Sequence, residues 1–329
     1  MLLTRLLTTS MKALAALLTV CLLSVSSLAM ADYPERTIRI IVPYPAGGAT
    51  DTLARQIAQG MSETWGQSVI VDNRPGASGI TGSNQVARSR KDGYTLLMGI
   101  VALAQLPALH ANLPFDVAED FAPLTEVARS QNLLVVPKSH GIATFEELLA
   151  RVKAEPGEHS YGSYGNGTSA HIYGEMLKQQ TGMDLVHIPY RGAAPLITDV
   201  LGERLTLGIV DAGSVRAHLD SGRFNVIAVT GAERSELVPE VPTLGELGLE
   251  NFDPYGWFGM FAPAGVPEPI LETLSTEIAR IIHSDEVSEV MRGFGLRPVG
   301  NDRETFAETV RSDLDVWTSV IEQTGIRIE

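Results

Sequence analysis

The sequence predicts an α/β protein of two lobes, each a mainly parallel sheet flanked by helices, joined by a double hinge. Three observations predict this fold. Strand-like and helix-like segments alternate in the N-terminal third, the alternation returns in the middle of the chain, and two extended apolar segments connect the halves. Alternation of this kind implies parallel strands with right-handed crossovers. The loops that follow such strands gather at one edge of the sheet, where ligands bind.

The N-terminal third contains a β-α-β-α-β pattern. Its first helix is indicated by Leu53, Ile57, Met61 and Trp65, which recur at i, i+4 spacing and so share one face. The expected strands and helices, in order, cover residues 37–43, 52–65, 68–71, 80–88 and 94–98.

The middle of the chain repeats this alternation and lies between two extended segments. The expected strands cover residues 159–163, 185–190, 205–210 and 224–230, with helices that end near residues 178, 201 and 219. Segments 124–137 and 255–265 are expected to cross between the lobes, and two helices, 268–283 and 305–323, follow the second crossing. These features predict that residues 32–128 and 258–329 form lobe 1 and residues 129–257 form lobe 2.

The first 31 residues have the pattern of a secretory signal. Arg5 and Lys12 precede the apolar run 13–23, and Ala29-Met30-Ala31 offers a cleavage site before Asp32. A membrane anchor is the alternative, but the run is shorter than the roughly 20 apolar residues that span a bilayer. The sequence therefore predicts export and cleavage. The only cysteine, Cys21, lies inside this segment, so the exported chain would hold no disulfide.

The composition is acidic and limits the classes of partner. The chain has a net charge of −14, and two of its positive residues lie in the signal. This balance argues against nucleic acid and against anionic lipid as partners. A small anionic ligand stays possible, because a site acts through local donors.

The stretch "YPAGGATD" predicts a loop that holds an anion. Gly47 and Gly48 let the backbone pass close to a ligand. The helix behind them presents free N–H groups and a partial positive charge. Asp51 has two interpretations, a helix cap or a residue that orders the loop or accepts a ligand hydrogen bond. A phosphate loop of the Walker type is excluded, because the required lysine is absent.

A second glycine-rich loop, "GNGTSA" over residues 165–170, precedes another helix. It fits the dinucleotide pattern G-x-G-x-x-A, with Asp184 near the usual acidic position. That pattern alone is weak, and an exported protein has little access to such a cofactor. The more general expectation is a second helix N-terminus, with Ser163, Thr168 and Ser169 as hydroxyl donors.

Signals of catalysis and of metal binding are lacking in the sequence. G-x-S-x-G and H-E-x-x-H do not occur, and the histidines are scattered. His171 is either a structural residue or a contact to ligand or water, and Arg191 is either solvated or directed at a carboxylate. Asp211 ends a strand and is either a cap or a site residue. The sequence thus predicts no catalytic residue, no metal ligand and no cofactor.

Eight segments in this order resemble the Bug-type solute receptors of tripartite tricarboxylate transporters. The segments are "YPAGGATD" with "LAR", "VDNRPGASG", "DGYTLL", "LPFDVAEDF", "YGSYGNGTSAH", "HIPYRGAAP", "PEVPTLGELG" and "FAPAGVPEP". The resemblance covers essentially the whole exported chain. It implies a periplasmic binding protein fold of type II, a small carboxylate ligand caught between closing lobes, and a monomer that delivers the ligand to a membrane permease. A sensor protein in place of the permease is the alternative.

The resemblance also implies the ligand-binding residues. They are Tyr44, Ala46, Gly47, Gly48 and Asp51 in the first loop, Ala77, Ser78 and Gly79 in the second, Ser163, Tyr164, Gly165, Asn166, Gly167, Thr168 and His171 in the third, and Tyr190, Arg191, Gly192 and Asp211 beside it.

One segment departs from the family pattern. After the third strand the family usually shows serine or threonine, whereas residues 100–104 carry no hydroxyl. If this segment lines the cleft, an acid with an aromatic or aliphatic body is favoured over citrate or malate. The alternative is that residues 100–104 pack in the lobe core. Two other classes of protein are also possible: an exported hydrolase or lyase that uses Asp51, His171 or Asp211, and a structural envelope protein without a ligand.

Overall fold

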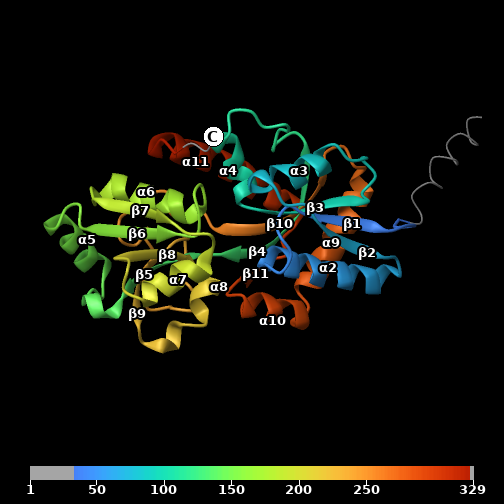
Figure 1. Ribbon diagram of the computed structural model, residues 1–329. Coiled ribbons are helices and arrows are strands. Elements are labelled where there is room, and N and C mark those ends of the chain that lie inside the picture. The colour runs from blue at the N-terminus through green and yellow to red at the C-terminus, as the bar shows by residue number, and fades with distance from the viewer. Residues whose placement is uncertain (1–32, 327–329) are drawn as a thin grey trace, which may run out of the picture.

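The computed structural model describes residues 33–326 and contains two sheets arranged along one long axis (Figure 1). The predicted signal, residues 1–31, lies outside the described residues. Among the described residues, no helix combines the length and the apolar character that crossing a bilayer requires.

The first sheet has six strands, and its parallel part is the predicted β-α-β-α-β unit. Strand β1 pairs in parallel with β2 and β3, whereas β10 runs antiparallel to β3 and β4, and β11 runs antiparallel to β4. Across the sheet the order is β11 (Arg297–Pro298), β4 (Phe121–Ser130), β10 (Gly256–Pro263), β3 (Thr95–Ile100), β1 (Ile38–Val42) and β2 (Val69–Asn73).

The second sheet has five strands and the same mixed character. Strand β6 pairs in parallel with β7 and β8, whereas β5 runs antiparallel to β8 and β9. The order is β7 (Leu185–Pro189), β6 (His159–Ser163), β8 (Leu207–Asp211), β5 (Asn132–Pro137) and β9 (Phe224–Val229). The sheets are therefore mixed and not mainly parallel, because β4, β5 and β10 enter them as antiparallel members.

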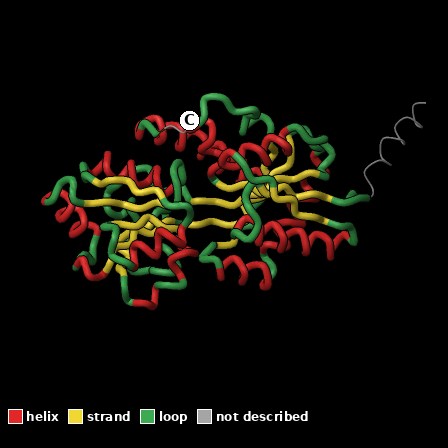
Figure 2. Tube along the Cα trace, viewed as in Figure 1, coloured by secondary structure: helices red, strands yellow, loops and turns green. Residues whose placement is uncertain are grey.

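These antiparallel strands are the two predicted crossings. Strand β4 belongs to the first sheet and β5 to the second, and only Gln131 separates them. Strand β10 returns the chain to the first sheet. Figure 2 shows both extended connections between the halves. Both crossings are confirmed, and they place two adjacent backbone connections at the centre of the molecule.

The helices cover the faces of both sheets and begin where strands end. In α2, the predicted face of Leu53, Ile57 and Met61 is fully buried, and the helix ends at Gly66 in the left-handed conformation. The helices are α2 (Ala49–Trp65), α3 (Ile80–Ala87), α4 (Ala102–Leu109), α5 (Phe145–Ala154), α6 (Ser169–Thr181), α7 (Ala193–Leu201), α8 (Ala212–Arg216), α9 (Glu268–Ile282), α10 (Asp285–Gly293) and α11 (Arg303–Thr324), with short 3₁₀ turns at Ala77–Gly79, Lys138–His140 and Leu219–Ser221.

Helix α11 contacts elements of both halves. Its Trp317 packs on Tyr173 of α6 with 5.5 Å between ring centroids, and the Gln179 side chain of α6 donates to the Gln323 carbonyl. Its N-terminal part packs on the first sheet, where the Phe306 ring meets Trp257 edge-on at 5.5 Å. The strands of the first sheet come from residues 38–130 and 256–298 and those of the second from residues 132–229. The lobe boundaries stay a prediction.

Candidate ligand-binding cleft

A cleft of about 620 Å³ lies where the loops of both sheets meet. Its walls come from the loops after β1, β2, β3, β6 and β8, from both crossings and from the α10–β11 connection. The lining residues are Tyr44, Gly47, Gly48, Ala49, Thr50, Ser78, Ile100, Val101, Ala102, Gln105, Leu106, Leu109, Ser130, Asn132, Tyr164, Asn166, Gly167, Thr168, Ser169, Asp211, Gly213, Ser214, Gly256, Trp257, Phe258, Phe294 and Leu296.

The first predicted ligand loop presents the N-terminus of α2 to this cleft. The helix is capped by Gly48, and no side chain of the described residues caps it. Asp51 lies in the first turn and accepts a hydrogen bond from the Gly47 amide at 3.0 Å and one from the Asn73 side chain at 3.0 Å. A hydrogen bond from Arg55 lowers the pKa of the Asp51 carboxyl. Asp51 therefore holds the loop in shape, and the first-turn amides of α2 stay directed at the cleft.

The second loop stands beside the first. Ala77 and Ser78 adopt left-handed φ values of 46° and 55°. A Cβ added to Gly79 would lie 3.1 Å from the Tyr44 hydroxyl, so this tyrosine rests on a position that suits glycine. Ser78 and Tyr44 line the cleft, whereas Ala77, Gly79 and the exposed Ala46 do not.

The third loop presents the N-terminus of α6 from the second sheet. Its cap is Thr168, whose hydroxyl donates to the Gly165 carbonyl at 2.7 Å and leaves the helix amides without a side-chain cap. The Gly167 amide donates to Nδ1 of His171 at 3.0 Å. Burial lowers the pKa of His171, which favours the neutral ring that can accept this bond. Asn166, Gly167 and Thr168 line the cleft, and His171 supports them from behind.

Beneath this loop lies a stack of neutral rings. The His171 and His187 rings lie 4.0 Å apart and nearly parallel, and Nε2 of His187 lies 2.7 Å from the Ser163 hydroxyl. Burial lowers the pKa of His187 to about 4. Ser163 is fully buried and also donates to the Gly165 carbonyl, so it supports the loop from beneath. Neither Ser163 nor Gly165 lines the cleft.

The residues after β7 lie outside the cleft. Tyr190 donates to Asp199 at 2.7 Å, Arg191 is exposed, and the Gly192 amide donates to the Tyr164 carbonyl at 3.2 Å. Of these three residues, Gly192 acts on the cleft indirectly, through the backbone of Tyr164.

Asp211 combines both roles that the sequence left open. Its carboxylate accepts from the Ser214 amide at 2.9 Å and caps α8, and it also lines the cleft. Asn132 lies opposite it on the neighbouring strand β5 and accepts from the Tyr164 hydroxyl at 3.0 Å. These three side chains form a polar surface on the second half of the molecule.

The hydroxyl-free segment after β3 divides between cleft and core. Ile100, Val101 and Ala102 line the cleft, whereas Leu103 and Ala104 are buried and do not. The next residue, Gln105, crosses the gap between the halves and donates to the Ser169 hydroxyl of α6 at 3.1 Å.

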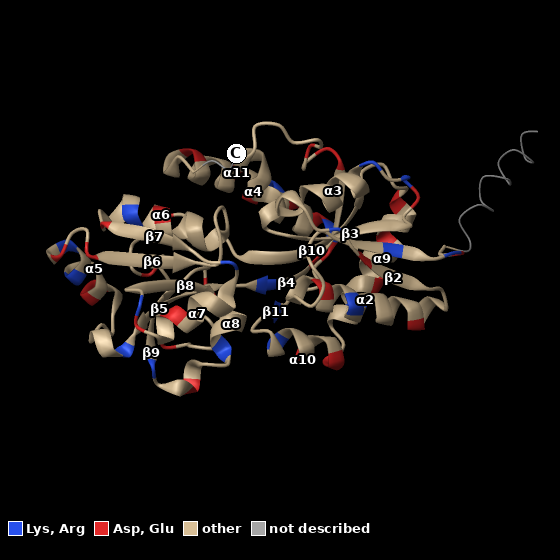
Figure 3. Cartoon of the chain, in the orientation of Figure 1, with Lys and Arg blue, Asp and Glu red and all other residues tan. Residues whose placement is uncertain are grey.

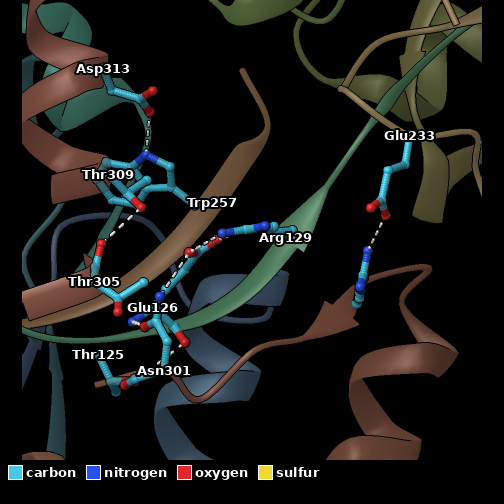
Figure 4. A network of polar contacts seen from close by, with 10 residues as sticks. Thr125, Glu126, Arg129, Glu233, Trp257, Asn301, Thr305, Thr309 and Asp313 are labelled. Carbon is cyan, nitrogen blue, oxygen red and sulfur yellow. Dashed lines mark hydrogen bonds and ion pairs between the residues drawn. The ribbon is translucent and has the colours of Figure 1, made fainter. Parts of the chain in front are cut away.

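The rear wall of the cleft is tied to the C-terminal helix. The Trp257 indole lines the cleft and donates to Asp313 of α11 at 2.7 Å (Figure 4). Burial raises the pKa of Asp313 to about 6. Nearby, the buried Glu126 pairs with Arg129 at 2.5 Å, and the Glu126 amide donates to Asn301.

A second cavity of about 210 Å³ lies beside the hinge and has the opposite character. Its basic residues come from β4, α8, the loop after β9, α10 and β11, and those on β4, α10 and β11 appear in blue in Figure 3. Arg297 pairs with Glu233 across the two halves at 2.8 Å. The five arginines are Arg129, Arg216, Arg234, Arg292 and Arg297.

Several cleft residues have no counterpart in the sequence prediction. Asn132 and Phe258 belong to the crossings, whose side chains the sequence could not orient, and Phe294 follows α10, a helix that was not predicted. Within residues 33–326, no group of three or more His, Cys, Asp or Glu side chains gathers as a metal site would require.

Comparison with known proteins agrees with this geometry. The profile of the "Tripartite tricarboxylate transporter family receptor" family matches residues 53–326. Protein BugT of Bordetella pertussis is 33% identical over 299 residues, which is 90% of this chain and 92% of BugT. A protein from Pseudomonas sp. strain P51, encoded between tcbD and tcbE, is 35% identical over 88% of this chain and 86% of its own length.

Solved structures are similar over nearly their whole length. A protein of R. palustris, solved with adipate, has a TM-score of 0.77 at 33% identity and covers 90% of this chain and 100% of its own. MatC of Rhodopseudomonas palustris, solved with malate, has a TM-score of 0.73 at 27% identity and covers 88% of this chain and 100% of its own. The extent of these matches, in sequence and in structure, shows that the chain belongs to the receptor family of the tripartite tricarboxylate transporters.

Proposed function

We propose that this protein is an extracytoplasmic receptor that captures a small carboxylate in the cleft and delivers it to the membrane permease of a tripartite tricarboxylate-type transporter. One observation carries the proposal: the N-termini of α2 and α6, from the two halves of the molecule, open into the same cleft without a side-chain cap. Free helix amides and the helix dipole bind anions. The relatives solved with adipate and with malate support a carboxylate as the anion.

The two loops contact the same carboxylate from the two halves of the molecule. Gly48 and Gly167 let the backbone approach the ligand, and Asp51 and His171 hold the loops from behind through the Gly47 and Gly167 amides. Because the donors are backbone amides on separate sheets, both loops contact the carboxylate fully only when the halves are close together. This is the geometry of hinge closure around a ligand.

The body of the ligand meets an apolar wall. Ile100, Val101 and Ala102 offer it no hydroxyl, and Trp257 and Phe258 form the rear. A ligand with polar groups throughout, such as citrate or malate, would leave some of them unpaired, at about 1–3 kcal/mol each. The preferred ligand is therefore a mono- or dicarboxylate with an aliphatic or aromatic core.

The remaining parts of the proposal rest on the sequence pattern and on the family resemblance. The signal of residues 1–31 directs the chain to the periplasm, where it is a monomer without catalytic activity. Residues 32–128 and 258–329 move as lobe 1 and residues 129–257 as lobe 2.

Native mass spectrometry of freshly purified protein, followed by calorimetric titration with carboxylic acids, tests this function. We expect one acid to copurify or to bind at one molecule per chain, and small-angle scattering to show compaction on binding. A ligand at one hundred times its Kd should also stabilise the fold by about 2.7 kcal/mol. Absence of binding by every acid at millimolar concentration, or turnover of a bound acid, would contradict the proposal.

A further inference from the structure

The cleft lacks the positively charged side chains that an anionic ligand would lead one to expect. Among the described residues that line it there is no lysine, arginine or histidine. Burial raises the pKa of both lining tyrosines, Tyr44 and Tyr164, so their phenols stay neutral. Asp211 is the one acidic side chain among these lining residues.

The helix N-termini at the cleft carry partial positive charge, but they differ in whether a side chain already caps them. The N-termini of α2 and α6 have no side-chain cap, whereas the carboxylate of Asp211 itself caps α8 through the Ser214 amide. Asp211 is fixed by this bond and lies next to Asn132 on the adjacent strand. The cleft thus has two uncapped helix ends, one on each half, and a fixed acidic side chain on the second half.

We propose that Asp211 makes the cleft selective for acids with a single carboxylate over acids with two. This inference rests on the proposed carboxylate-binding function and names its ligand class: an apolar body with one carboxylate. A second carboxylate would meet no cationic side chain and would be repelled by Asp211. For two charges roughly 8 Å apart at an effective dielectric constant of about 20, the repulsion lowers affinity on the order of thirtyfold.

Pairs of acids that share a body and differ by one carboxylate test this selectivity. Hexanoate is compared with adipate, and benzoate with terephthalate, by calorimetric titration of the wild-type protein. We expect the monocarboxylate of the tighter-binding pair to have a Kd at least tenfold lower than its dicarboxylate. A dicarboxylate that binds as tightly as, or more tightly than, its partner overturns the inference. Adipate is informative because a relative was solved with it.

Two variants separate charge from structure. In Asp211→Asn the amide oxygen still accepts from the Ser214 amide, so α8 keeps its cap while the charge is removed. We expect the ratio of the two Kd values to fall by about tenfold. In Asn132→Asp the acceptor for Tyr164 is kept and a second charge is added, so the ratio should rise. Ratios that do not change in either variant, with melting temperatures near that of the wild type, overturn the role of Asp211.

The results also distinguish a failure of this selectivity from a failure of the proposed receptor function. If dicarboxylates bind best, the receptor function holds and the selectivity is wrong. If no member of either pair binds and no other carboxylic acid does, both are wrong. If only an acid outside the pairs binds, it is compared with the analogue that has one carboxylate more or fewer, and the same ratio decides.

Discussion

The ligand cleft and the arginine-lined cavity are neighbours with opposite chemistry. Leu296 lines both of them, and both are bounded by elements of the two halves. Among the described residues that line the cleft one is acidic and none is basic, whereas the smaller cavity gathers five arginines around Glu233 and Glu236. The protein thus places these five arginines beside the hinge and not in the cleft where we expect the anion to bind.

This contrast underlies our proposal that the molecule binds an anion without a cationic side chain. A guanidinium can form a bidentate pair with a carboxylate, as Arg129 does with Glu126. In our proposal the cleft uses instead the amides of two helix ends, which lie on separate halves. Recognition is therefore coupled to the relative position of the halves, which a cation within one half would not achieve.

The largest expected effect comes from filling the cleft at Gly48. A Cβ placed there meets no atom within 4 Å, and Gly48 has a φ of −84°, so Gly48→Val should fold normally. Its side chain would occupy the space in front of the α2 amides, and binding should weaken by at least a hundredfold in calorimetric titration.

The matched control for Gly48→Val lies in the other cavity. Arg292→Gln removes an exposed charge there and should leave the Kd of the ligand within about twofold. If Gly48→Val and Arg292→Gln weaken binding equally, it is wrong that the cleft binds the ligand and the arginine-lined cavity does not.

A second prediction concerns Asp313, which accepts a hydrogen bond from the cleft-lining Trp257. Its pKa of about 6 in the fold lies above the ordinary value of 3.8. The neutral carboxyl is therefore favoured by folding, so its contribution to stability is complete below pH 4 and is lost as the pH rises through 6. Asp313→Asn keeps an acceptor for Trp257. At pH 7 its free energy of unfolding should exceed that of the wild type by about 1–3 kcal/mol, so it should unfold at a higher denaturant concentration.

Equilibrium unfolding at pH 4 and at pH 7 checks this expectation. The advantage of Asp313→Asn over the wild type should shrink toward pH 4. A difference that stays constant with pH would show that Asp313 does not titrate in this range.

A third prediction concerns the apolar wall. Ala102 is half-buried and lines the cleft, and Ala102→Ser adds one hydroxyl at little cost in volume. Malate should then bind severalfold more tightly relative to an apolar-bodied acid. If titration finds the ratio unchanged, Ala102 does not contact the body of the ligand.

The smallest effect is expected for the ion pair between Arg297 and Glu233. Both side chains are more than half exposed, at 55% and 68%. Exposed pairs contribute about 0–1 kcal/mol and are screened by salt. A double-mutant cycle with Arg297→Met and Glu233→Gln should therefore give a coupling below about 1 kcal/mol in urea unfolding. A larger coupling that persists in 0.5 M salt would assign this pair a role in holding the halves together.

The sequence predicted those parts of the site that depend on local pattern. Periodicity located α2, and glycines located the loops of Gly48 and Gly167, because a helix end behind a glycine turn is encoded within a few residues. The signal for α5 was also present, since Thr144 and Glu147 form a capping box, although that helix was not predicted. Helix α4 lacked a signal, because it is apolar on most faces and contains Pro107.

The rest of the site depends on contacts between distant segments. The register of Asn132 opposite Asp211 is set by the pairing of β5 with β8. The positions of Trp257 and Phe294 depend on how β10 and α10 pack against the other half. Long-range pairing of this kind leaves no pattern in a single sequence, so the rear wall of the cleft could not be predicted.

The uncapped helix ends have a consequence for engineering. In our proposal the main chain holds the acid group. We therefore expect a scan that truncates side chains to find few residues that matter for it, and substitutions in Ile100, Val101, Ala102 or Phe258 to alter only which body is accepted. The fold thus separates a constant acid-binding element from an adjustable selectivity element. A library randomised at the wall positions, with residues 44–51 and 163–171 left intact, should yield sensors for many different acids from this one scaffold.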